Sequence, residues 1–243
     1  ITNLYMPIKK LARKFKQVLP DVPIICGGIH VTSLPDETIK QDCFDMLCLG
    51  EGEGAMEDLL QRMREKRTYT DIKNLWVKDA SGHIHKNDKR PVIRPLESLP
   101  KPDKSLFAKY GALTSRIMIM TTRGCPFACT FCVNNATLAM YPHQKPIRKR
   151  SVDHIINELL WVKENLPYIG KIKFDDDAFF LHSLKDIEEF SKRYKEKIKL
   201  PLMITGATPS TLKRDKLAVL VDAGLTEMRM GIQTAGERTK VLY

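Results

Sequence analysis

The sequence has no apolar run long enough to span a membrane, and its front end contains no recognisable signal peptide. Cysteine is scarce, with six among 243 residues, which excludes a small disulfide-stabilised scaffold. Three of these cysteines lie close together, where they would be oxidised in a secreted protein, so the sequence predicts a cytoplasmic location. An initial methionine is also missing. The chain begins at Ile1, inside a helical pattern, and we therefore expect a fragment of a longer protein.

The composition is 43% hydrophobic and 28% charged, as in ordinary soluble globular proteins, and the length suits one large or two small domains. The formal net charge is +11, and a basic surface can attract nucleic acid, anionic lipid or acidic substrates. The basic residues are nevertheless scattered, and we interpret the densest group as a solvated face. That group is Lys145, Arg148, Lys149 and Arg150. Nucleic acid is therefore not an expected partner.

The most informative feature is a group of three cysteines, Cys125, Cys129 and Cys132, separated by three and two residues. Thiolates this close together can bind three irons of a cubane iron–sulfur cluster. No fourth cysteine lies nearby in the sequence, so one iron would keep an open position for a small molecule, as catalytic metal sites do. The alternatives are a structural zinc site or three buried cysteines. Zinc usually takes four ligands, and His143, the nearest candidate, does not have zinc-finger spacing.

The first 90 residues alternate between helical and strand patterns. An amphipathic helix is predicted by apolar residues at three- and four-residue steps, namely Leu4, Ile8, Leu11, Phe15 and Val18. Short apolar runs at 22–26 and 46–49 predict buried parallel strands, with helices near 35–41 and 55–63. A hairpin is expected around Asp79–Gly82. This order is typical of the second half of a doubly wound sheet. The remaining cysteines, Cys26, Cys43 and Cys48, lie in apolar contexts and are interpreted as small core residues.

Four prolines between positions 91 and 102 predict an extended connector, and we place it at 91–112. After it, strands are expected at 117–120, 172–174, 202–204 and 228–232. The intervening helices are expected to begin after Ser151, near Leu184 and after Ser210. Repeated βα units predict a parallel barrel or partial barrel. The sequence therefore predicts an α/β protein with a front domain at 1–90, the connector, and a partial (β/α) barrel at 113–243.

The segment from Thr121 to Cys132, with Phe131 before the last cysteine, resembles the cluster loop of the radical S-adenosylmethionine (SAM) superfamily. The resemblance implies that Cys125, Cys129 and Cys132 bind a 4Fe–4S cluster, and that the methionyl amine and carboxylate of SAM chelate its fourth iron. An electron from the reduced cluster would then cleave SAM to methionine and a 5′-deoxyadenosyl radical. A protein such as flavodoxin or ferredoxin would donate the electron. Phe131 would lie near the adenine, unless it packs in the core.

The same resemblance implies further SAM contacts at two strand ends. Asp175, Asp176 and Asp177 stand where many members have a Gly-Gly-Glu stretch, and one of the three acids could hold the SAM amine. Gln233 and Thr234 follow the fourth predicted barrel strand. They resemble a Gly-x-Gln-Ser stretch whose polar side chains reach SAM, although a simple glycine turn would give the same pattern.

The front domain resembles the cobalamin-binding domain that precedes the radical domain in one large subclass. Glycine-rich loops follow its two predicted strands, with Gly27 and Gly28 in the first and Gly50, Glu51 and Gly52 in the second. In that subclass these loops lie against the lower part of the corrinoid, and glycine lets a ligand approach the backbone closely. His30 is interpreted as a helix-capping or surface residue rather than a cobalt ligand. The resemblance implies the C-terminal half of a Rossmann-like cobalamin-binding domain, then a partial radical SAM barrel, with both ends truncated.

Together these features predict a cobalamin-dependent radical SAM enzyme. The commonest chemistry of that subclass is methyl transfer to an unactivated carbon or phosphorus, here of a small-molecule substrate, and ring formation or rearrangement is the alternative. A second hypothesis is a methylthiotransferase acting on RNA or protein, which requires another set of cluster cysteines in the front domain. A third is a zinc-binding regulatory protein. No sequence feature specifies the substrate.

Overall fold

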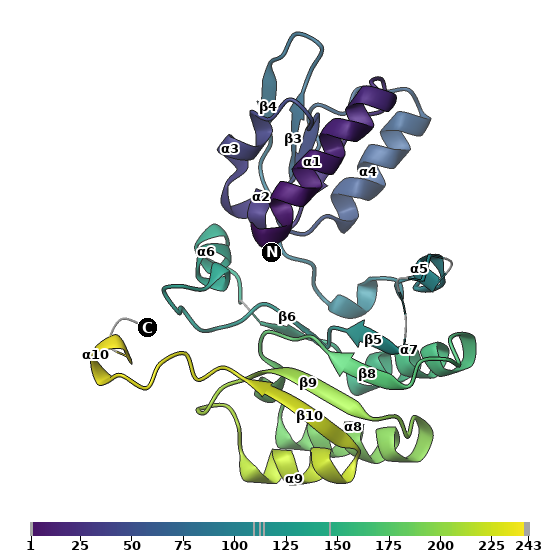
Figure 1. Ribbon diagram of the computed structural model, residues 1–243, viewed down its shortest axis with the longest axis vertical. Coiled ribbons are helices and arrows are strands. Elements are labelled where there is room, and N and C mark those ends of the chain that lie inside the picture. The colour runs from purple at the N-terminus through teal and green to yellow at the C-terminus, as the bar shows by residue number, and fades with distance from the viewer. Residues whose placement is uncertain (1, 109, 112, 114, 146, 241–243) are drawn as a thin grey trace. The chain divides into compact units, whose positions relative to one another are not determined.

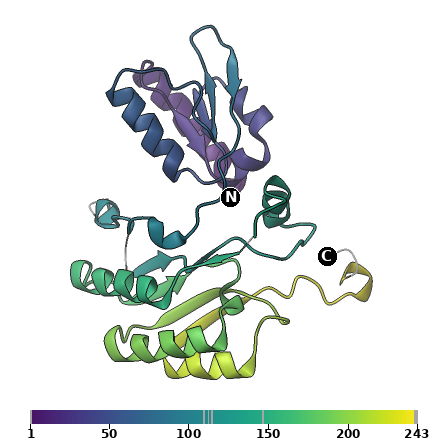
Figure 2. The same ribbon diagram turned by 180° about the vertical axis from the view of Figure 1, so that it is seen from behind.

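Two compact units make up the chain, each with its own sheet and core. The computed structural model describes residues 2–108, 110–111, 113, 115–145 and 147–240, and Figures 1 and 2 show it from opposite sides. The first unit comprises Ile1–Ile93 and Phe131–Gln144, and the second comprises Arg94–Thr130 and Lys145–Tyr243. None of the helices in the described ranges is both long and apolar enough to cross a membrane.

The first unit is built on a four-stranded sheet with strand order β1-β2-β3-β4. The strands are β1 (Ile25–Gly27), β2 (Met46–Cys48), β3 (Leu75–Lys78) and β4 (Ile84–Lys86). β1 and β2 are parallel, and the β3–β4 hairpin continues the sheet in antiparallel pairing. All of β2 is buried, as expected for a strand covered on both faces. The two predicted parallel strands and the hairpin are confirmed.

The described residues of this first unit form the helices α1 (Thr2–Val18), α2 (Ile29–Ser33), α3 (Pro35–Ile39), α4 (Glu53–Arg64) and α6 (Val133–Met140). The sequence predicted the first helix and those near 35–41 and 55–63, but not the short α2 that Gly28 caps at a positive φ of 90°. Buried residues form two core clusters, which contain Cys43 and Cys48. The interpretation of these two cysteines as core residues agrees with their burial.

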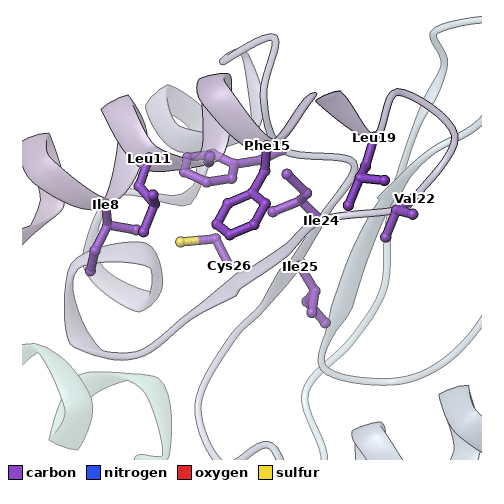
Figure 3. Close-up of a pocket in the computed structure, with 10 residues that line it drawn as sticks. Ile8, Leu11, Phe15, Leu19, Val22, Ile24, Ile25 and Cys26 are labelled. Carbon is purple, nitrogen blue, oxygen red and sulfur yellow. The ribbon is translucent and has the colours of Figure 1, made fainter. Parts of the chain in front are cut away.

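Helix α1 is amphipathic, but much of its apolar face remains exposed. Leu11 and Phe15 keep 54% and 51% of their surface exposed, and side chains of α1 line an apolar cavity of about 230 Å³. In Figure 3 these side chains lie over Ile24 and Cys26 at the start of the sheet. The prediction of an amphipathic helix is confirmed. The described residues cover the apolar face of α1 only in part, although such a face is usually buried.

The second unit is built on a parallel sheet with strand order β10-β9-β8-β5. Its strands are β5 (Arg116–Ile119), β8 (Lys171–Phe174), β9 (Leu202–Ala207) and β10 (Leu225–Met230). A separate antiparallel pair joins β6 (Thr122–Arg123) to β7 (Arg148–Lys149). Each strand of the main sheet pairs with the next one along the chain, which is the arrangement that the repeated βα pattern predicts.

The helices of the second unit are α5 (Ser105–Ala108), α7 (Val152–Asn165), α8 (Leu184–Lys197), α9 (Arg214–Asp222) and α10 (Glu237–Lys240), with short 3₁₀ turns at Leu96–Ser98 and Phe179–Leu181. Helices α7, α8 and α9 cover one face of the sheet (Figure 1) and bury a continuous apolar core with it. On β5, Ile117 and Ile119 point into that core, while Met118 on the opposite face is 55% exposed. The sheet is therefore covered by helices on one face, as in a (β/α) barrel wall.

Of the three helix starts predicted for this unit, two are confirmed. Ser151 caps α7 by accepting a hydrogen bond from the His154 amide, and α8 begins at Leu184. The prediction for α9 is wrong, because that helix begins at Arg214. Thr208 and Thr211 close a separate turn through hydrogen bonds between their hydroxyl and backbone groups, and this turn uses the segment around Ser210 before the helix starts.

Candidate functional site

The candidate residues of the second unit lie at the carboxyl ends of its parallel strands. β5 leads into the cysteine loop, β8 ends before Asp175–Asp177, and β10 ends before Gly231–Thr234. Because these strands are parallel neighbours, their carboxyl ends share one edge of the sheet. This edge is where parallel barrels build their sites.

All three cysteines of the motif are half-buried, and none of them is in a disulfide. Cys132 also caps the start of α6 with an extended backbone. Three thiols with no disulfide match the donor set of a cubane cluster that has three protein ligands. Within the part of the chain that the structure describes, no group of three or more His, Cys, Asp or Glu side chains is spaced to hold a metal ion. The cluster ligation therefore stays a prediction from the motif.

The three acids after β8 have different environments. Asp175 is exposed and pairs with Lys173, whose Nζ lies 2.5 Å from Asp175 Oδ1. Asp177 is also exposed, whereas Asp176 is buried with only 4% of its surface exposed. Side chains alternate in direction along an extended segment, which places the middle acid inward and its two neighbours outward. A contact with SAM stays a prediction for all three, and the outward position suits Asp175 and Asp177.

Asp176 binds the beginning of the cysteine loop. Its Oδ1 accepts hydrogen bonds from the backbone amides of Thr121 at 2.7 Å and Thr122 at 2.6 Å. The two threonine hydroxyls also donate to the carboxylate, each at 2.9 Å. Burial raises the pKa of Asp176, and these hydrogen bonds oppose the rise because they stabilise the charged form. The carboxylate therefore serves as an acceptor for four donors of the loop.

β9 supports the segment that carries these acids. Thr205 Oγ1 donates to the carbonyl oxygens of Phe174 at 3.2 Å and Asp176 at 3.3 Å. Gly206 has a φ of 79°, and a methyl group there would overlap the Asp176 carbonyl oxygen and lie 2.9 Å from the Asp177 carbonyl carbon. Only glycine adopts this backbone conformation readily while allowing so close an approach.

The turn after β10 holds the two polar residues predicted to reach SAM. Gln233 has a φ of 64° and is exposed, while Thr234 is half-buried. The Thr234 hydroxyl accepts a hydrogen bond from the Gly236 amide at 3.1 Å. Phe131, predicted to lie near the adenine, is 51% exposed, so it does not pack in a core. None of these observations tests the contact with SAM itself.

In the first unit, the two glycine loops follow neighbouring parallel strands. Gly27 and Gly28 are exposed after β1, and Gly50, with a φ of 71°, follows β2. The Gly50 amide donates to Thr32 Oγ1 at 3.1 Å, which ties the second loop to α2. His30 is half-buried and stacks on Tyr5 with 3.8 Å between ring centroids. Its interpretation as a capping or surface residue rather than a cobalt ligand stays a prediction.

Glu51 and Gly52 complete the second loop, and a wide cavity opens beside it. Glu51 Oε2 accepts a hydrogen bond from the Ile93 amide at 2.6 Å, and its carbonyl accepts one from Asn74 at 2.7 Å. The cavity measures about 640 Å³, and Leu49, Trp76 and Tyr141 are among the residues that line it. The loop is thus held by the unit itself, and there is space beside it for a ligand. Contact of the two loops with cobalamin remains a prediction.

Sequence reasoning did not identify Thr121, Thr122, His182 or Gly206 as parts of the site. Thr122 stands three residues before Cys125, and this closeness to the cysteine motif was the available signal for the two threonines. His182 and Gly206 join the site through contacts with residues distant in sequence, which no local pattern indicates.

Comparison with known proteins decides the family. The model of the radical SAM superfamily matches residues 119–243, which is 125 of the 243 residues, and the model of the B12-binding domain matches residues 2–60. The chain belongs to the radical SAM superfamily. The predicted family and α/β fold class are therefore confirmed. The predicted set of cluster, SAM and cobalamin is also confirmed at the level of these domain families and of the solved members described below.

Curated relatives match most of the chain. The uncharacterized methyltransferase PH0819 of Pyrococcus horikoshii is 29% identical over 233 residues, which cover 94% of this chain and 49% of the relative. The anaerobic magnesium-protoporphyrin IX monomethyl ester cyclase of Rubrivivax gelatinosus is 25% identical over 233 residues, covering 91% of the chain and 40% of the relative. The cobalamin-dependent radical SAM methyltransferase TokK of Streptomyces tokunonensis is 26% identical over 162 residues, covering 63% and 23%. The chain spans about half or less of the length of these relatives.

Solved structures share the fold. The cobalamin-dependent SAM radical enzyme OxsB, with aqua-cobalamin and SAM bound, superposes with a TM-score of 0.72 at 17% identity, over 98% of this chain and 35% of that protein. The methyltransferase TsrM of Kitasatospora setae, with cobalamin and a [4Fe-4S] cluster bound, superposes with a TM-score of 0.70 at 17% identity, over 94% and 44%. At this identity the likeness establishes the fold.

Proposed function

We propose that the chain carries the two cofactor domains of a cobalamin-dependent radical SAM methyltransferase. The observation that carries this proposal is the order of the two domain matches, a B12-binding domain followed by a radical SAM domain in one chain. Relatives that bear the name methyltransferase match most of this chain or the larger part of it. We propose that the methyl group is transferred to an unactivated atom of a small-molecule substrate.

The residues present suit the three groups that such an enzyme holds. Cys125, Cys129 and Cys132 would bind the cluster irons, because their spacing suits three ligands of one cluster and none of them is in a disulfide. The glycine loops of the first unit would lie against cobalamin, and Gly28 has open space where a side chain would otherwise stand. Bound together, these groups supply one-electron cleavage of a sulfur–carbon bond in SAM and transfer of a methyl group.

The chain's own side chains would bind and orient SAM at the edge of the second sheet. Asp175 and Asp177 point outward from the end of β8 and provide negative charge for the SAM amine. Lys173 pairs with Asp175 through its Nζ. Gln233 and Thr234 provide polar groups from the end of β10. Phe131 belongs to the first unit, and its exposed ring is the aromatic surface that we propose for adenine.

Ring formation is a second candidate function. It is favoured by the Rubrivivax gelatinosus cyclase, which matches 91% of this chain at 25% identity. The domain order is the same for both chemistries, since a fold does not determine the reaction that it supports. Detection of a methylated product or of a dehydrogenated, cyclised one separates the two candidates.

The methylthiotransferase and zinc hypotheses make different demands on the cysteines. A second cluster would require Cys26, Cys43 and Cys48, yet Cys43 and Cys48 are buried, and burial raises the pKa of all three thiols. Thiols that resist ionisation are poor metal ligands. Three clustered cysteines outside any disulfide suit a reducing compartment, and a flavodoxin or ferredoxin there is the electron donor that we propose.

The test is anaerobic reconstitution of the purified chain with iron and sulfide, followed by addition of SAM and hydroxocobalamin. We expect about four irons and four sulfides per chain, the number in one cubane cluster, an electron paramagnetic resonance (EPR) signal that changes when SAM is added, and a bound corrinoid spectrum. The matched control is Cys125→Ala, which should lose the cluster and retain the corrinoid. Uptake of zinc in place of iron, or a cluster signal that ignores SAM, would contradict the proposal.

A further inference from the structure

The peptide at the end of β5 is held by charged side chains from two sides. On its amide side, Asp176 accepts the backbone hydrogen bonds of Thr121 and Thr122 at 2.7 and 2.6 Å. β8, which ends just before Asp176, is the strand that pairs with β5. The direction in which the chain leaves β5 is therefore set by a carboxylate from the neighbouring strand end.

Arg150 binds the carbonyl side of the same peptide. Its Nη1 donates to the Met120 carbonyl oxygen at 2.9 Å, and its backbone amide donates to the Thr121 carbonyl oxygen at 2.9 Å. Its Nη2 lies 2.6 Å from Glu158 Oε2, and the Glu158 side chain is 2% exposed. Buried charges are costly unless they are paired, so Glu158 holds Arg150 against the strand end.

The interpretation of Arg150 and Arg148 as members of a solvated face is wrong, because Arg148 is 8% exposed and Arg150 has 12% of its side chain exposed.

The Thr121 hydroxyl links this arrangement to a buried histidine. It donates to Asp176 Oδ2 at 2.9 Å, and His182 Nε2 lies 3.2 Å from Thr121 Oγ1. A hydroxyl has one proton to donate, so His182 is the donor in the second contact, from Nε2. Burial lowers the pKa of His182 to about 4, and the neutral ring therefore completes the hydrogen bonding of Thr121.

We propose that Asp176, Arg150 and Glu158 act as positioning residues for the cysteine loop, which they hold by fixing the peptide at the end of β5. We name these three residues the loop clamp. Cys125 follows Thr122 by three residues, a span of roughly 10 Å at most, so a shift of the strand end reaches the first cysteine. The inference rests on the proposed function for the identity of the group that the cysteines hold.

Other strand ends of this sheet are held differently. At the end of β9, the Ala207 carbonyl oxygen accepts a hydrogen bond from the Gly231 amide at 3.0 Å, an ordinary contact between backbone groups. The end of β5 instead contacts charged side chains from two places, Arg150 after β7 and Asp176 after β8. Glu158 on helix α7 acts through its pairing with Arg150. Charge-assisted hydrogen bonds are stronger and more directional than neutral ones, which suits a peptide that has to present three thiols in one arrangement.

The test compares Asp176→Ala and Asp176→Asn with Tyr194→Phe. The last variant is the structural control, because it removes a largely buried 2.9 Å hydrogen bond to the Leu200 carbonyl in the same unit, away from the loop. In the apo protein, we expect trypsin to cleave after Arg123 at least about tenfold faster in Asp176→Ala, since several hydrogen bonds of the loop are lost. Asp176→Asn should restore part of the protection, because its amide oxygen still accepts from the two backbone amides. Tyr194→Phe should be cleaved at the wild-type rate.

After reconstitution, the same variants are compared by iron content and by the change that SAM causes in the EPR signal. Asp176→Ala should hold less iron and show an altered response to SAM, while the control variant matches the wild type. Wild-type cleavage together with a wild-type EPR response in Asp176→Ala would overturn the inference. If that variant does not fold, Asp176→Asn and Thr122→Val decide the question with the same measurements. A wild-type chain that binds no iron would contradict the proposed function, while cleavage of the apo variants would still test the loop clamp.

Discussion

Gly206 is the position at which a single methyl group should disturb the site most. Its backbone has a φ of 79°, and it passes directly under the peptide that joins Asp176 to Asp177. A Cβ at this position would overlap the Asp176 carbonyl oxygen and lie 3.0 Å from the Asp177 carbonyl oxygen. The substitution Gly206→Ala therefore combines an unfavourable backbone conformation with a steric conflict.

Both contributions can be estimated. An alanine in the left-handed region costs about 1–2 kcal/mol, and relieving an overlap with neighbouring backbone costs about 1–3 kcal/mol. We therefore expect Gly206→Ala to lower the free energy of unfolding of the second unit by about 2–5 kcal/mol, a large part of the stability of a typical domain. Because the overlap involves the Asp176 peptide, the variant should also accelerate trypsin cleavage after Arg123.

The matched control is Gly224→Ala. Gly224 has a φ of 112°, but a Cβ there would lie 3.5 Å from the Leu200 carbonyl oxygen, an ordinary contact. The control therefore tests the backbone conformation without the overlap. Urea unfolding can be followed by the fluorescence of Trp161 on α7, in a Trp76→Phe background that removes the other of the two tryptophans. If the two alanine variants differ by less than about 0.5 kcal/mol, the ordinary scatter of mild substitutions, the argument from close approach is refuted.

Three further predictions follow from buried charge and exposed apolar surface. Burial lowers the pKa of His182 to about 4, against about 6.5 in the unfolded chain. Between these two pH values the unfolded state binds more protons than the folded state. The free energy of unfolding should therefore fall by up to about 3 kcal/mol from pH 7 to pH 4. Urea unfolding of His182→Gln should show a flatter pH dependence, and equal slopes would contradict this. Glu158→Ala leaves Arg150 and Lys104 without their carboxylate partner. In a denaturant titration it should lower the free energy of unfolding by about 3–5 kcal/mol. A decrease below about 1 kcal/mol, typical of an exposed ion pair, would mean that the pair is solvated. Phe15→Ser on α1 should reduce binding of the dye ANS to the native protein, since Phe15 lines the apolar cavity; unchanged dye fluorescence would place the exposed apolar surface elsewhere.

The strand order of the second unit could be predicted from the sequence because its signals are local. Each strand is a short apolar run followed by an amphipathic helix, and such βα units assemble in one way. The helix caps at Ser151 and Ser183 are local as well, although the latter was not identified. The cysteine motif carried the family assignment because its spacing follows from the ligand geometry of one cluster.

The role of Asp176 could not be read from the sequence in the same way. Three adjacent acids look alike, and what distinguishes the middle one is its hydrogen bonds to residues 54 and 55 positions earlier. Arg150 was misjudged for the same reason, because its partner carboxylate is buried on a helix and a run of basic residues normally indicates solvent. Long-range pairing of buried charges leaves no periodic signal in the sequence.

The sequential pairing of β5, β8, β9 and β10 also has a consequence during synthesis. A sheet of this kind can grow strand by strand as the chain leaves the ribosome, since each new strand joins the one made before it. Asp176 is made 51 residues after Cys125, so at 5–20 residues per second it follows after roughly 3–10 s. During that interval the nascent loop lacks the carboxylate that accepts the Thr121 and Thr122 amides in the folded chain.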